Sequence, residues 1–140
     1  MRILFLCVAN SARSQMAEAL ARHRLGTKHE FFSAGSKPTE VHPMAIEVMR
    51  EIGIDISHQK SKSIDTIDFS KIEAVVTLCA EEVCPTIPKK TKRLHWSLPD
   101  PARLDMSKTS RISKSSLTGQ LDEFRKIRDK ISEFLETFDI

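Results

Sequence analysis

Short apolar runs, each about the length of a strand, recur along this chain and alternate with longer runs at helical spacing. The short runs cover residues 1–7, 30–36, 71–79 and 93–96. The run at 71–79 shows no alternation of apolar and polar positions, which is typical of a parallel strand buried on both faces. We therefore expect four strands.

Three helical patterns separate or follow these strands. Residues 14–25 and 42–52 each carry apolar side chains at helical spacing and end at a glycine, and residues 117–138 form a long amphipathic pattern. Strands that alternate with helices predict an α/β protein with a doubly wound parallel sheet. We expect one domain over residues 1–140, with a four-stranded sheet in a three-layer α/β/α arrangement. Ligands of such sheets bind beyond the carboxyl ends of the strands.

The first predicted strand ends on Cys7 and leads into a short loop that closes with Arg13 and Ser14 at the start of the first predicted helix. Loop N–H groups, the positive end of a helix and the planar Arg13 guanidinium suit a tetrahedral oxyanion. The same positive surroundings, with a hydroxyl donor from Ser14, favour the thiolate form of Cys7 and make it a candidate nucleophile. The residues expected to bind the oxyanion are Val8, Ala9, Asn10, Ser11, Ala12, Arg13 and Ser14.

This order of cysteine, five residues, arginine and serine, directly after an N-terminal strand, resembles the low-molecular-weight protein tyrosine phosphatase fold. The thioredoxin-coupled arsenate reductases share that fold. The resemblance extends over nearly the whole chain and includes the segments Phe32–Gly35 and Gly53–Ser57. It implies that Cys7 is the catalytic nucleophile, that Arg13 binds the oxyanion, and that Asp100, in an Asp-Pro pair, is the general acid.

Two further cysteines distinguish the reductases from the phosphatases. The segment Val75–Pro85, which contains Cys79 and Cys84, resembles the redox segment of the reductases, although only four residues separate its two cysteines. The resemblance implies a thiol relay that reduces arsenate to arsenite, with a Cys7–Cys79 disulfide and then a Cys79–Cys84 disulfide. Reduced thioredoxin would reopen the last disulfide as external electron donor, and no bound cofactor is expected.

A cation site beside the loop is a further property of the family. Some members bind potassium there through side chains that match Asn10, Glu18 and Ser33, but at the fourth position this chain has Lys62. A lysine ammonium can make hydrogen bonds to the same oxygen atoms. We therefore expect no metal and no potassium requirement. The alternative is an exposed Lys62 without such a role.

Composition narrows the setting of the protein. The 140 residues are 40% hydrophobic and 29% charged, which is typical of a soluble globular domain. The net charge is +3, but basic residues cluster only at 89–93, so we expect no nucleic-acid partner. Neither a membrane span nor a secretory leader is recognisable, and three cysteines favour redox chemistry in a cytoplasmic protein. A monomer is expected. The histidines show no zinc-site spacing, and only His95 is expected near the site.

Two other functions stay open on the sequence. A low-molecular-weight protein tyrosine phosphatase acting on phosphate esters would use Cys7 and leave Cys79 and Cys84 as protective redox partners. A binding module that holds trivalent arsenic on its cysteines would leave Arg13 unexplained. For the reductase, arsenate is the expected substrate, phosphate and sulfate are the competing oxyanions, and a glutaredoxin-type reductant is the alternative to thioredoxin.

Overall fold

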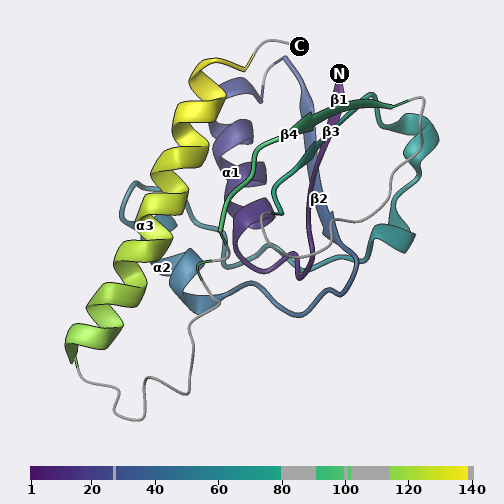
Figure 1. The fold of residues 1–140 in the computed structure, drawn as a ribbon. Coiled ribbons are helices and arrows are strands. Elements are labelled where there is room, and N and C mark those ends of the chain that lie inside the picture. The colour runs from purple at the N-terminus through teal and green to yellow at the C-terminus, as the bar shows by residue number, and fades with distance from the viewer. Residues whose placement is uncertain (27, 80–90, 100, 102–113, 139–140) are drawn as a thin grey trace.

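The computed structural model describes residues 1–26, 28–79, 91–99, 101 and 114–138, and the structural statements below concern these residues. Four strands form one sheet in the order β2-β1-β3-β4, and every neighbouring pair is parallel (Figure 1). The predicted α/β class with a doubly wound parallel sheet is confirmed. The strands are β1 (Arg2–Cys7), β2 (Glu30–Gly35), β3 (Ala74–Thr77) and β4 (Lys92–His95).

The helices follow the predicted order with small changes in their ends. They are α1 (Arg13–Leu25), α2 (Pro43–Arg50) and α3 (Lys114–Glu136). Figure 1 shows all three on the same side of the sheet, with α3 lying along α1. The opposite face is covered by a segment that contains the short 3-10 helices η1 (Ile64–Thr66) and η2 (Phe69–Lys71). Among the described helices, none combines the length and the apolar character needed to cross a bilayer.

Strand β1 lies at the centre of two cores, which explains its unbroken apolar sequence. Ile3 and Phe5 belong to the cluster beneath the helices, whereas Leu4 and Leu6 belong to the cluster beneath the 3-10 segment. All four side chains are fully buried. A strand covered on both faces needs apolar residues at odd and even positions, so no alternation survives in its sequence. The first cluster is completed mainly by Met16, Leu20, Phe31, Phe124, Ile127 and Ile131.

An aromatic group holds α3 against the sheet. Trp96, directly after β4, stacks on Phe134 of α3 with a ring-centroid distance of 5.0 Å and an interplanar angle of 7°. The same indole lies 5.9 Å from the Phe5 ring of β1. Such pairs contribute about 0.5–1.5 kcal/mol each beyond their buried area. The long C-terminal helix is therefore part of the main core.

The topology places the carboxyl end of β1 between those of β2 and β3. The chain leaves β1 toward β2 on one side and returns to β3 on the other side of β1, so the direction of winding changes at the carboxyl end of β1. Ligand sites of open α/β sheets lie at such a point. Cys7 is the last residue of β1, and Cys79 follows β3 by two positions.

Candidate active site

Cys7 lies at the base of a cavity above the carboxyl end of β1. Its side chain is a free thiol and is only 2% exposed. The cavity has a volume of about 230 Å³ and is lined by Cys7, Ala9, Ser11, Ala12, Arg13, Thr39 and His42. A space of this size, between an oxyanion-type loop and the start of α1, can hold a small tetrahedral anion.

The loop above Cys7 is held in place through its carbonyl groups. The carbonyl oxygens of Val8, Ala9 and Ser11 accept N–H hydrogen bonds of 2.9–3.1 Å from the segment after β2. The donors are, in order, the backbone N–H groups of Lys37, Thr39 and His42. These carbonyls are thus satisfied by the segment after β2. An anion site built from peptide groups needs such pairing, because unpaired carbonyls that faced the anion would repel it.

Asn10 has an unusual backbone conformation and connects the loop to the segment around Ser61 and Lys62. Its φ of 49° is in the left-handed region, and it is the sole non-glycine residue there among those described. The backbone oxygen of Asn10 accepts hydrogen bonds from Ser61 Oγ at 2.7 Å and Gln15 Nε2 at 3.0 Å. Its side-chain oxygen accepts from the Lys62 N–H at 2.8 Å and from Gln15 Nε2 at 2.9 Å. Four hydrogen bonds therefore offset the backbone strain of this conformation.

These contacts also set the direction of hydrogen bonding toward Cys7. Because Asn10 Oδ1 accepts two N–H groups, its Nδ2 faces Ser14 and donates to Ser14 Oγ at 2.7 Å. Ser14 Oγ lies 2.9 Å from Cys7 Sγ. The hydroxyl oxygen already accepts from Asn10, so its own hydrogen is available to donate to sulfur. Ser14 can thus donate a hydrogen bond to the sulfur of Cys7, which is the contact that the sequence led us to expect.

Arg13 lies beside Cys7 as the first residue of α1, with a side chain that is almost fully buried. Its Nη1 donates to the Leu98 carbonyl at 2.9 Å and to the Leu78 carbonyl at 3.3 Å. No side chain in the described part of the chain caps the start of α1. The helix N-terminus and a buried guanidinium thus both border the cavity, and both attract an anion.

Cys79 lies just beyond β3, the strand that pairs with β1. The Leu78 N–H donates to the Leu6 carbonyl at 2.9 Å, so the main chain before Cys79 continues the pairing of β1 with β3. The Cys79 side chain is 2% exposed and disulfide-bonded. The predicted resolving cysteine, Cys84, and the predicted general acid, Asp100, lie outside the described residues.

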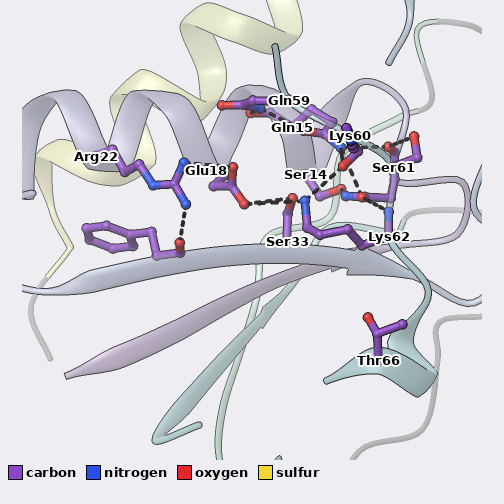
Figure 2. A network of polar contacts seen from close by, with 12 residues as sticks. Ser14, Gln15, Glu18, Arg22, Ser33, Gln59, Lys60, Ser61, Lys62 and Thr66 are labelled. Carbon is purple, nitrogen blue, oxygen red and sulfur yellow. Dashed lines mark hydrogen bonds and ion pairs between the residues drawn. The ribbon is translucent and has the colours of Figure 1, made fainter. Parts of the chain in front are cut away.

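The predicted cation position contains the Lys62 ammonium (Figure 2). Lys62 Nζ lies 3.8 Å from Glu18 Oε1 and donates to the Lys60 carbonyl at 2.8 Å. Buried Glu18 also accepts from Ser33 Oγ at 3.0 Å and pairs with Arg22 at 3.2 Å. This donor set does not fit a potassium ion, because an ammonium faces Glu18 and the Asn10 side-chain oxygen already accepts two N–H groups. Among the described residues there is no group of three or more His, Cys, Asp or Glu side chains suited to a metal ion.

Sequence reasoning missed part of this site. Gln15, which is fully buried, accepts from Gln59 Nε2 at 2.7 Å through its side-chain oxygen and so joins the segment before Lys62 to the loop. His42 lines the cavity, whereas we expected only His95 near the site. His95 lies at the end of β4, where its Nδ1 is 2.6 Å from Thr77 Oγ1. A polar residue in the first turn of α1 was the only sequence signal for Gln15.

Comparison with known proteins agrees with this geometry. The family model of low molecular weight phosphotyrosine protein phosphatases matches residues 2–139. The arsenate reductase of Halalkalibacterium halodurans is 41% identical over 138 residues, which cover 97% of this chain and 93% of that protein. The arsenate reductase of Brevibacillus brevis is also 41% identical, over 97% of this chain and 92% of that protein.

Solved structures of arsenate reductases also superpose on this chain. An arsenate reductase in a phosphate binding state superposes with a TM-score of 0.77 at 33% identity, covering 97% of this chain and 94% of that one. A thioredoxin-dependent arsenate reductase from Corynebacterium glutamicum superposes with a TM-score of 0.65 at 30% identity, covering 97% of this chain and 60% of that one.

This chain therefore belongs to the low molecular weight phosphotyrosine protein phosphatase family. Within that family, the relatives described above are arsenate reductases. The resemblance drawn from the cysteine, arginine and serine of the loop and from the two further cysteines is thereby confirmed.

Proposed function

We propose that this chain is an arsenate reductase that works by a relay of three cysteines and is recycled by thioredoxin. The observation that carries the proposal is that two cysteines lie at the carboxyl ends of adjacent strands. Cys7, at the end of β1, is a free thiol within hydrogen-bond distance of Ser14, and Cys79 follows the adjacent strand β3. A phosphatase needs the first position alone, whereas reduction by thiols needs both.

The first step is nucleophilic attack. Arsenate binds in the cavity against the loop N–H groups and the Arg13 guanidinium, and the Cys7 thiolate attacks arsenic. Asp100 gives a proton to the departing hydroxide, which leaves as water. A bond between Cys7 sulfur and arsenic(V) has formed, and no oxidation state has changed.

The second step is the two-electron transfer. The Cys79 thiolate attacks Cys7 sulfur, the sulfur–arsenic bond breaks, and its electron pair stays on arsenic, which leaves as arsenite. The Cys84 thiolate then attacks Cys79, which releases the Cys7 thiolate and forms the Cys79–Cys84 disulfide. A dithiol of thioredoxin reduces this disulfide. A free Cys7 beside a disulfide-bonded Cys79 supports this order of exchanges.

Lys62 supplies the positive charge that a potassium ion would otherwise bring to Glu18, so the enzyme works without potassium. The 3.8 Å approach of its ammonium to buried Glu18 supports this role. We further propose a cytoplasmic monomer that needs no bound cofactor, with phosphate and sulfate as competing oxyanions. A glutaredoxin-type reductant in place of thioredoxin is the alternative to be tested.

The test is oxidation of NADPH by purified protein with thioredoxin and thioredoxin reductase when arsenate is added, next to hydrolysis of p-nitrophenyl phosphate. We expect many turnovers with arsenate and only weak hydrolysis of the ester. Turnover with glutaredoxin and glutathione alone would change the assigned reductant. Hydrolysis of the ester without arsenate reduction would make the protein a phosphatase, as its family name allows.

A further inference from the structure

Arg13 makes two contacts that oxyanion binding does not require. Its Nη1 donates to the carbonyl of Leu78, the residue before Cys79, and to the carbonyl of Leu98, which lies just beyond β4. The Arg13 side chain is 3% exposed, so solvent hardly competes for these bonds. The guanidinium of the loop thus reaches the main chain of two other strand ends.

The two carbonyls lie where the backbone pairing of the sheet stops. The Leu78 N–H donates to the Leu6 carbonyl at 2.9 Å, and the Leu78 carbonyl accepts the Leu98 N–H at 3.3 Å. The next residue after Leu98 is Pro99, which has no N–H to continue the ladder. Arg13 therefore adds a second hydrogen bond to the Leu78 carbonyl and one to the Leu98 carbonyl, where the backbone pairing between these two segments ends.

We propose that Arg13 is also a positioning residue, which fixes the main chain before Cys79 next to Cys7 so that the first disulfide of the relay can form. This inference rests on the proposed relay. Any disulfide needs its two Cα atoms within about 7 Å, so the main chain before Cys79 has to stay close to Cys7. A planar guanidinium holds two carbonyls and an anion at once through separate N–H groups, which a lysine cannot do in the same geometry.

The test measures the Cys7–Cys79 disulfide without arsenate. Reduced Cys84→Ser protein is equilibrated with glutathione and glutathione disulfide, so that two protein thiols lose two electrons and one glutathione disulfide becomes two glutathione molecules. The equilibrium constant gives the effective concentration of the two thiols. We expect Arg13→Lys, which keeps the charge, to lower it about tenfold. Arg13→Gln should lower it at least as much.

A matched control is available on α3. Arg128 is also a buried arginine whose Nη1 donates to a backbone carbonyl, that of Val48 at 2.7 Å, but it lies outside the cavity lining. Arg128→Lys should lower the melting temperature and leave the disulfide equilibrium within twofold of the parent, about 0.4 kcal/mol. Repeating the measurement at pH 9 separates positioning from thiol ionisation, because an effect of ionisation alone shrinks there.

An unchanged equilibrium constant in both Arg13 variants would overturn the positioning role. An equal loss in Arg128→Lys would also overturn it, because the effect would then follow general stability. The outcome is independent of catalysis: a protein that fails to reduce arsenate but shows the tenfold loss refutes the proposed function and keeps the positioning role.

Discussion

Ser14 Oγ lies 2.9 Å from Cys7 Sγ and at the same time accepts a hydrogen bond from the Asn10 side chain at 2.7 Å. This series of hydrogen bonds begins at the Lys62 N–H, which donates to the side-chain oxygen of Asn10 at 2.8 Å. A segment 52 residues further along the sequence thereby helps to prepare the nucleophile. The chemistry of Cys7 depends on contacts that its own loop does not contain.

Ser14→Ala should slow the reaction of Cys7 with iodoacetamide at least about tenfold at pH 7, because a hydrogen bond to a charged group is worth roughly 1.5–3 kcal/mol. The reaction is followed by mass spectrometry in a Cys79→Ser, Cys84→Ser background. Ser36→Ala is the matched control, since Ser36 is exposed and outside the cavity lining. An unchanged rate in Ser14→Ala would remove the role of the hydroxyl.

Lys62 should make the protein indifferent to potassium. The melting temperature of the wild type is expected to be equal in KCl and NaCl at the same ionic strength. In Lys62→Asp a carboxylate replaces the ammonium beside Glu18, so this variant should melt at a higher temperature in KCl than in NaCl. A potassium-specific rise in the wild type would contradict the assignment of Lys62.

Gly35 should tolerate no side chain, because it lies directly under the loop. A Cβ there would be 2.3 Å from the Val8 carbonyl oxygen and 2.9 Å from the Asn10 nitrogen. Gly35→Ala should therefore destabilise the fold by roughly 1–3 kcal/mol in urea unfolding and slow the alkylation of Cys7. Gly119→Ala on α3 has open space and should stabilise by about 0.5–1 kcal/mol. Equal stability of the two variants would refute the close packing.

Glu51 should make stability depend on acid pH. Hydrogen bonds from Arg125, and then from Arg128, hold the pKa of Glu51 at about 2, below its ordinary value of 4.5. A lowered folded-state pKa stabilises the protein above pH 4.5, and this contribution is lost as the pH falls from there toward 2. Since Glu51 is partly exposed, we expect about 1 kcal/mol. Between pH 7 and pH 3, the free energy of unfolding of Glu51→Gln should fall by about 1 kcal/mol less than that of the wild type. Parallel pH curves would contradict it.

Sequence reasoning predicted the parts of this protein whose signals are local. The apolar runs located all four strands, and the order of Cys7, Arg13 and Ser14 identified the loop. Contacts over long sequence distances were not predictable. Gln59 reaches Gln15 over 44 residues and Ser61 reaches Asn10 over 51, and polar side chains in irregular segments carry no periodicity.

Element ends were less predictable for a related reason. We expected the last helix to begin near residue 117, but α3 starts at Lys114, since its first residues are polar and add nothing to the apolar pattern. The predicted strand over 71–79 is reduced to Ala74–Thr77 because η2 occupies the residues before it. The predicted roles of Cys84 and Asp100 and the single domain over residues 1–140 stay predictions.

The three-cysteine relay is tested most directly by a single turnover without any external reductant. Fully reduced protein is mixed with excess arsenate, arsenite is quantified, and the disulfide is located by peptide mass spectrometry. We predict one arsenite per chain with a Cys79–Cys84 disulfide and free Cys7 in the wild type, and a Cys7–Cys79 disulfide in Cys84→Ser. Three free thiols and no arsenite after the reaction would contradict the account.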